Sequence, residues 1–225
     1  MTGWLALLVV GLAGCAEPPR LVVFAAASTV DVVDAVLDGV PLDASVSVAS
    51  SSVLAHQIAQ GAPADVYVTA DPGWTDWLIA RGISVRRRRV VATGRMVVVG
   101  RAAPAVTARQ ALRGRIAVAD PSHVPAGRYA RRALQRAKVW DALEPRLIAT
   151  ADVRAALAAV TTGAADRAIV YASEARHAGL PIVWAFPPDE AIRFELAELS
   201  GAGAEVFDAL AVTPAWAAEG FGPRR

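Results

Sequence analysis

The sequence is poor in cysteine, lysine and histidine, and each shortage excludes a class of protein. Cys15 is the only cysteine among 225 residues, so no disulfide can form within the chain. Lys138 is the only lysine, and the 23 basic residues are balanced by 21 acidic ones, which argues against a surface dedicated to nucleic acid. His56, His123 and His177 are isolated from one another and lack the spacing of metal ligands, so we expect no metal centre.

Long hydrophobic runs are also missing. The apolar stretch Trp4–Ala13 is shorter than the roughly 20 residues that span a bilayer, and it has the length of a signal-peptide core. It ends in Leu12-Ala13-Gly14-Cys15, which resembles the lipobox of bacterial lipoproteins. We therefore expect residues 1–15 to be a lipoprotein signal peptide, Cys15 to carry a lipid anchor and residues 16–20 to form a tether. A plain secretory signal or a buried N-terminal helix is the alternative, since no Lys or Arg precedes the apolar stretch.

The remaining chain is rich in apolar residues. Hydrophobic residues make up 55% of the sequence, which is enough for a buried core and excludes wholesale disorder. The expected strands are Leu21–Ala26, Ser45–Ala49, Asp65–Thr69, Arg95–Gly100, Arg115–Ala119, Ala168–Tyr171 and Pro181–Trp184. Most of them lack alternation of polar and apolar residues, which is typical of parallel strands buried on both faces. Ala-rich stretches of helical periodicity lie between them, so the sequence predicts a doubly wound α/β fold.

Two breaks in composition divide this α/β chain. Thr93-Gly94 separates the run Arg86–Arg89 from the next strand, and Pro187-Pro188 is the second break. We expect two lobes, with residues 21–93 plus 188–225 forming lobe I and residues 94–187 forming lobe II. The arginine run is expected to be a solvated turn between the lobes, and a contact with a membrane surface or a partner protein is the alternative.

Polar residues and helix starts follow five of the expected strands and helices. These places are Ala27–Asp31, Ser50–Ser52, Asp120–Gly127, Thr150–Val153 and Tyr171–Ser173. In open α/β sheets, ligands bind beyond the carboxyl ends of the strands. Helix N-termini at that edge present unpaired N–H groups and the positive end of the helix dipole. With Ser and Tyr hydroxyls as further donors, they predict an anion site that needs no charged side chain.

Each place also has an ordinary structural interpretation. Ser28 is a suitable N-cap, with Asp31 completing a capping box. Ser50–Ser52 reads as a polar loop, and Tyr171 as a core tyrosine with a satisfied hydroxyl. Pro125–Gly127 reads as a plain helix start. No single place is specific, and only their joint placement favours a binding site.

The order and spacing of five segments are more specific. These segments are Phe24–Ser28 (FAAAS), Ala49–Asp71, Ala119–Leu134, Ala151–Leu157 and Ile169–Ala175. Together they resemble the molybdate-binding proteins of ABC transporters, which are class II periplasmic-type binding proteins. The resemblance runs from about Leu21 to the C-terminus. It implies a two-lobe fold, each lobe a mainly parallel sheet flanked by helices, with the ligand cleft between the lobes.

The resemblance also implies the ligand set. A tetrahedral oxyanion would lie between the lobes, held by the hydroxyls of Ser28 and Ser51 from lobe I. The backbone N–H groups of Ala126 and Val153 and the hydroxyl of Tyr171 would complete the site from lobe II. Molybdenum or tungsten would be held only as the oxyanion, with no direct bond between metal and protein. No cofactor and no enzymatic activity are implied.

The implied role is capture of molybdate or tungstate on the periplasmic or extracytoplasmic face of a membrane. The protein would be a lipid-anchored monomer that passes the ion to an ABC permease and its ATPase. A pocket of donors suits a fully deprotonated dianion, because the proton of hydrogen phosphate would be left unpaired at a cost on the order of 1–3 kcal/mol. Sulfate would be excluded by its smaller size.

Three other functions remain as alternatives. A binding protein for another tetrahedral oxyanion, such as sulfate, thiosulfate or phosphate, would share the fold. The effector lobe of a transcription regulator also shares it, but no helix-turn-helix segment precedes Leu21. A serine hydrolase could use Ser51, His56 and Asp71, but the sequence has no G-x-S-x-G elbow. The sequence departs from the family pattern in its lipobox, in the short segment Asp38–Ser45 and in the polar FELAELSG after Arg193.

Overall fold

A computed structural model describes residues 21–101, 104–105, 107–187 and 192–224 of the chain. The predicted signal peptide, Cys15 and the tether at residues 16–20 lie outside the described residues, as does Pro188. Within the described part, every helix is too short or too polar to cross a bilayer.

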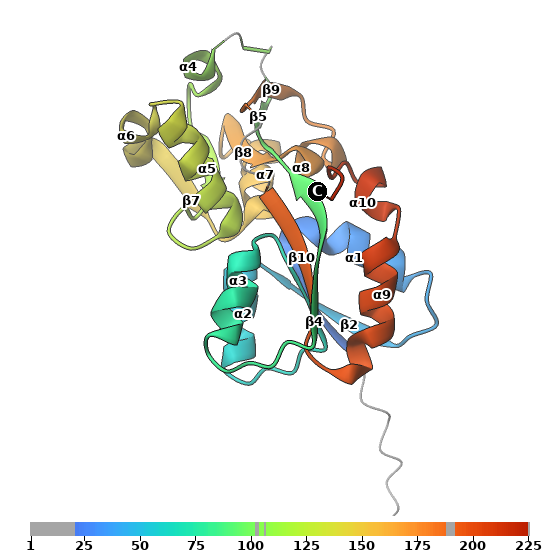
Figure 1. Cartoon of the computed structure of the whole chain (residues 1–225). Coiled ribbons are helices and arrows are strands. Elements are labelled where there is room, and N and C mark those ends of the chain that lie inside the picture. The colour runs from blue at the N-terminus through green and yellow to red at the C-terminus, as the bar shows by residue number, and fades with distance from the viewer. Residues whose placement is uncertain (1–20, 102–103, 106, 188–191, 225) are drawn as a thin grey trace, which may run out of the picture.

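The chain forms two five-stranded sheets, one in each half of the molecule (Figure 1). The first sheet has the order β2-β1-β3-β10-β4, with β2 Ala44–Ala49, β1 Leu21–Ala26, β3 Val66–Thr69, β10 Ile192–Glu198 and β4 Arg87–Gly94. The second has the order β7-β6-β8-β5-β9, with β7 Leu147–Thr150, β6 Ile116–Ala119, β8 Arg167–Tyr171, β5 Met96–Gly100 and β9 Ile182–Ala185. In each sheet one strand, β10 or β5, runs antiparallel to its neighbours and the others share a direction.

Helices cover both faces of the sheets. In the first half, α2 and α3 lie on one side of the sheet and α1 and α9 on the other (Figure 1). The helices of this half are α1 Val30–Leu37, α2 Ser51–Ala59, α3 Pro72–Ile79 and α9 Ala204–Val212, with α10 Ala215–Ala218 near α1. Those of the second half are α4 Ala108–Ala111, α5 Pro125–Arg136, α6 Trp140–Leu143, α7 Val153–Thr161 and α8 Ala172–His177. Short 3-10 helices are η1 Ala27–Thr29, η2 Glu144–Arg146 and η3 Gly201–Gly203. Strands covered on both faces explain the continuous apolar runs, and the predicted α/β fold is confirmed.

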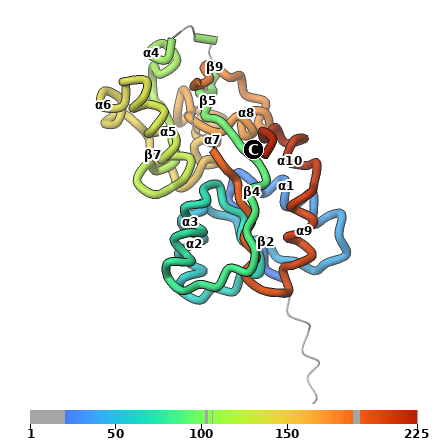
Figure 2. The backbone as a smooth tube through the Cα atoms, viewed as in Figure 1, coloured from blue at the N-terminus to red at the C-terminus, as the bar shows by residue number. Residues whose placement is uncertain are grey.

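The chain passes between the sheets twice. Strand β4 ends at Gly94 in the first sheet and β5 begins at Met96 in the second. Strand β10 brings the chain back and lies against β4, so the two connections run side by side (Figure 2). The exact lobe boundaries at residues 93/94 and 187/188 stay a prediction.

The expectation that Arg86–Arg89 forms a turn is wrong, although the four side chains are exposed as expected. Residues from Arg87 onward form β4, which pairs antiparallel with β10. Neither strand was predicted from the sequence, because their charged residues hide the apolar pattern that marks a buried strand. Strand β7 was also missed, although its four residues carry no charge.

The charges of β4 and β10 neutralise each other. Glu195 and Glu198 are buried on β10, at 3% and 2% exposure. Arg86 Nε lies 3.1 Å from Glu198 Oε1, Arg87 also pairs with Glu198, and Arg88 Nη2 lies 3.0 Å from Glu195 Oε2. A buried carboxylate is tolerated only when it is paired. The arginine run and the acidic FELAELSG segment are therefore two halves of one ion-pair ladder.

Candidate functional site

The five predicted ligand residues line one cavity between the two halves of the molecule. They are Ser28, Ser51, Ala126, Val153 and Tyr171, accompanied by Ala26, Ala27, Ser50, Ala70, Val124, Pro125 and Asp152. This cavity is small, with a volume of about 10 Å³. Such a space is far smaller than the roughly 300–1,000 Å³ of sites for organic molecules, so only a small ligand suits it.

Ser28 is not the helix N-cap that its sequence context suggests. It lies in η1, and neither η1 nor α1 has a side-chain cap. The turn is instead fixed by Thr29, whose Oγ1 donates to the carbonyl oxygen of Ala26 at 2.8 Å. Ser28 is buried, and its hydroxyl makes no hydrogen bond within the described part of the chain. Its proton is therefore free for a ligand in the cavity.

Ser50–Ser52 lie at the start of α2, and the hydroxyls of Ser50 and Ser51 make different hydrogen bonds. Ser50 is the N-cap of α2 and accepts from the backbone N–H of Val53. Ser51 Oγ accepts a hydrogen bond from the backbone N–H of Ala70 at 3.0 Å. The Tyr67 hydroxyl donates to the carbonyl oxygen of Ser51 at 2.7 Å. The Oγ of Ser51 therefore only accepts a hydrogen bond within the protein, and the hydroxyl proton of Ser51 remains available to a ligand in the cavity. The support from Ala70 and Tyr67 was missed from sequence, because it joins segments that are distant along the chain.

Two helix N-termini bring backbone donors to the cavity. Helix α5 starts at Pro125, which has no N–H, and no side chain caps its first turn, so the N–H of Ala126 is left free. Gly127 allows this turn to lie close to β6, because a Cβ there would stand 2.1 Å from the carbonyl oxygen of Ala119. In α7, Asp152 accepts from the N–H of Ala155 at 2.8 Å.

The cap of α7 leaves the N–H of Val153 without an intrahelical partner. Both helices therefore direct unpaired N–H groups and the positive ends of their dipoles to one place, as in an anion site.

Tyr171 supplies a buried hydroxyl without a partner. Its side chain is 1% exposed, and its oxygen has no hydrogen bond within the described residues. The ring packs edge-on against Phe194 of β10, with centroids 5.3 Å apart. Burial raises the pKa of the Tyr171 hydroxyl well above its usual value, so the group stays protonated. An unpaired buried donor costs about 1–3 kcal/mol, and an acceptor in the cavity would remove that cost.

The cavity is rich in donors and poor in acceptors. Asp152 is the only charged residue among the described residues that line it, and its carboxylate is engaged in capping α7. No lining residue can neutralise a ligand by charge, so hydrogen bonding has to hold it. This arrangement suits a small anion that needs only donors.

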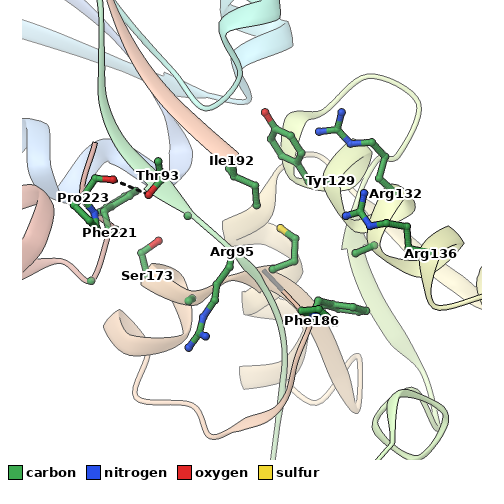
Figure 3. A pocket seen from close by; sticks show the side chains of 17 residues that line it. Thr93, Arg95, Tyr129, Arg132, Arg136, Ser173, Phe186, Ile192, Phe221 and Pro223 are labelled. Atoms are coloured by element: carbon green, nitrogen blue, oxygen red, sulfur yellow. Dashed lines mark hydrogen bonds between the residues drawn. The ribbon is translucent and has the colours of Figure 1, made fainter. Parts of the chain in front are cut away.

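A larger cavity of about 360 Å³ lies where the chain passes between the sheets (Figure 3). Thr93 and Arg95 line it from the first connection, and Phe186 and Ile192 from the second. None of the five predicted ligands lines it. Both connections between the sheets therefore border this cavity.

Because of Glu174 on α8, we expect the stability of the folded protein to depend on pH. It is buried, one carboxylate oxygen has no hydrogen bond, and burial raises its pKa from 4.5 to about 7, against the opposing effect of Arg154. The folded state therefore holds a proton that the unfolded state releases, so the free energy of unfolding should fall by about 2–3 kcal/mol between pH 4.5 and 7. Glu174→Gln should abolish this decline in urea unfolding measured at pH 5 and 8. Glu205→Gln, an exposed carboxylate on α9, should preserve it, and an equal decline in Glu174→Gln would contradict the assignment.

The fold and the site together define a class of protein. Two α/β halves that enclose an ion-sized cavity at the carboxyl ends of their strands form a solute-binding protein. The chain matches the family model of bacterial extracellular solute-binding proteins over residues 21–211 and belongs to this family.

Within this family, the chain is similar to molybdate-binding proteins of several bacteria. The chain is 37% identical over 193 residues to the molybdate-binding protein ModA of Escherichia coli (strain K12), covering 77% of this chain and 74% of the relative. It is 37% identical over 187 residues to ModA of Haemophilus influenzae, covering 76% and 74%. The periplasmic molybdate-binding protein of Azotobacter vinelandii has the same fold, with a TM-score of 0.79 at 22% identity over 92% of this chain and 100% of that one. The predicted family resemblance is confirmed.

Proposed function

We propose that this protein captures molybdate and delivers it to an ABC transporter. The observation that carries the proposal is the convergence of free donors on an ion-sized cavity, above all the buried, unpartnered hydroxyl of Tyr171. Ser28, Ser51 and Tyr171 would donate through hydroxyls, and Ala126 and Val153 through backbone N–H groups. The ModA relatives support molybdate as the ion.

The site chemistry supports a proton-free dianion. Hydrogen phosphate would bring a donor into a cavity without a free acceptor, at a cost of about 1–3 kcal/mol. Sulfate carries no proton, and its shorter bonds would stretch every contact in a cavity matched to molybdate. Tungstate is nearly the same size as molybdate, so we propose that it binds as well.

The cellular setting is proposed on the same basis. Residues 1–15 would direct export, and Cys15 would anchor the protein by lipid at the extracytoplasmic face of a membrane. The partners would be a permease and its ATPase, and the receptor would act as a monomer. A hydrolase centre at Ser51 has no support, because His56 Nδ1 bonds to the carbonyl oxygen of Ser52 at 2.7 Å and Asp71 caps α3.

Calorimetric titration of the purified protein with molybdate, tungstate, sulfate and phosphate in one buffer tests the proposal. We expect 1:1 binding of the first two ions and far weaker binding of the others. Equal binding of sulfate or phosphate would keep the class of protein and overturn the substrate. Absence of binding to all four would overturn the proposed function.

Tyr171→Phe should move binding and stability in opposite directions. Loss of the hydroxyl should weaken molybdate binding about 5- to 30-fold, which corresponds to about 1–2 kcal/mol for a hydrogen bond to a charged group. The ligand-free protein should be as stable as the wild type or more so, because an unpaired buried group has been removed. Calorimetry and urea unfolding give both values. Unchanged molybdate affinity would remove Tyr171 from the site.

A further inference from the structure

Two aspartate–arginine ion pairs join the halves in the described part of the molecule. Asp71, which follows β3 and caps α3, faces Arg128 on α5, with 3.2 Å between Oδ2 and Nη1. Asp31 on α1 pairs with Arg154 on α7. In both pairs the aspartate comes from the half with the first sheet and the arginine from the half with the second.

Three of these four residues lie close in sequence to a donor of the candidate site, and Asp71 follows Ala70, whose N–H holds Ser51. Arg154 follows Val153, and Asp31 lies three positions after Ser28. This pair therefore joins the segments of Ser28 and Val153.

The second pair, Asp71–Arg128, lies near the donors Ser51 and Ala126. Arg128 lies two positions after Ala126, and Asp71 follows Ala70, whose N–H holds Ser51. It therefore joins the segments of Ser51 and Ala126, so each lobe-I hydroxyl has its own bridge to a lobe-II donor.

The two pairs differ in their surroundings. The side chains of Arg154 and Asp31 are 31% and 28% exposed, so salt screens this pair less than a fully exposed one. In the other pair Asp71 is 16% exposed and Arg128 is 45% exposed, so we expect stronger screening there. Glu174 Oε2 lies 3.7 Å from Arg154 Nε, and His177 Nδ1 lies 3.4 Å from Asp31 Oδ2. The pair at Asp31 is thus the centre of a small polar network.

We propose that Asp31–Arg154 and Asp71–Arg128 form a double latch that closes the lobes over the bound oxyanion and sets its rate of release. The inference rests on the proposed function. None of the four side chains is among the described residues that line the cavity. They are positioning residues, and they bring the donors of the two halves to the ion.

The physical basis is differential stabilisation of one state. Opening of the lobes separates each aspartate from its arginine, so the ion pairs stabilise the closed state alone. A ligand that binds the closed state gains affinity by the same factor. Each pair combines one negative and one positive side chain, so the latch adds no net charge near the cavity. Hydrogen bonds therefore remain the interactions that hold the ion. Loss of a pair should act mainly on dissociation, as truncation of partly buried charge pairs does.

The test measures molybdate affinity and dissociation rate by calorimetry and stopped-flow fluorescence. Arg154→Ala and Arg128→Ala should each raise the dissociation rate about 3- to 10-fold, and the double variant more. Dissociation from the wild type should accelerate with salt, and this dependence should be weaker in the double variant. The exchanged pair Asp31→Arg with Arg154→Asp should recover affinity lost in either single variant.

Arg131→Ala is the matched control, because Arg131 lies on α5 near Arg128 but contacts Trp140 of the same half. Its molybdate binding should equal that of the wild type. If the wild type binds molybdate and the latch variants release it at an unchanged rate, the latch is overturned alone. If the wild type binds no molybdate, the proposed function fails and the latch fails with it.

Discussion

Gly127→Ala is expected to weaken molybdate binding severely. The added Cβ would stand 2.1 Å from the carbonyl oxygen of Ala119 and 2.4 Å from that of Asp120. Both obstacles are backbone atoms, so the first turn of α5 has to move away from β6. That movement displaces the N–H of Ala126 from the cavity. We expect at least about a 100-fold loss of affinity, together with a loss of stability of about 2–4 kcal/mol.

The matched control is Gly39→Ala. Gly39 is exposed, and a Cβ there would meet nothing closer than the carbonyl oxygen of Val36 at 3.5 Å. This variant should bind molybdate like the wild type, as calorimetry would show. Circular dichroism would establish that Gly127→Ala is folded at the temperature of the titration. A folded Gly127→Ala protein with wild-type affinity would exclude the α5 N-terminus from the site.

Ser51→Ala should cost nearly as much, for a different reason. The hydroxyl would be lost to the ion as a donor, and the N–H of Ala70 would lose its acceptor at the same time. A hydrogen bond to a charged group is worth about 1.5–3 kcal/mol, so affinity should fall about 10- to 100-fold from the first effect alone. The unpaired N–H of Ala70 should also lower the free energy of unfolding by about 1–3 kcal/mol. Titration calorimetry and urea unfolding measure the two effects separately.

Ser52→Ala provides the comparison within the same triplet. Ser52 is fully buried, but its hydroxyl bonds to Ser50 at 3.0 Å and it is absent from the described lining of the cavity. Its replacement should affect stability and leave molybdate affinity within about threefold of the wild type. If Ser52→Ala weakened binding as much as Ser51→Ala, the loss would come from a damaged α2 and not from a lost ligand.

The sequence was a good guide where structure depends on neighbouring residues. Strands β1, β3, β6 and β8 were predicted because a buried parallel strand appears as an unbroken apolar run. The helix starts at Pro125 and Val153 were marked by proline and by an aspartate cap. The carboxyl ends of such strands marked the places of the site. The resemblance to molybdate-binding proteins supplied the five candidate ligands, and the structure brings them together.

The sequence failed where a residue depends on a distant partner. Asp31 fits a capping box by its spacing, but in the structure it pairs with Arg154 across the cleft. Arg88 reads as part of a solvated turn because its partner Glu195 is more than 100 residues away. Ser28 reads as a cap because nothing local reveals that its hydroxyl is left free. In each case the local pattern allows the wrong assignment, and only tertiary contacts decide it.

The insertion of β10 between β3 and β4 has a consequence for the order in which the molecule assembles. Strand β4 has no other strand neighbour in the described sheet, so it has no place in a sheet until residues 192–198 have left the ribosome. The second sheet is built entirely from residues 96–185 and can be completed earlier. Contacts between distant parts of a chain form slowly. The half that is started first in synthesis is therefore finished last, and a growing chain stays without its ion-binding cleft until residues 192–198 have been made.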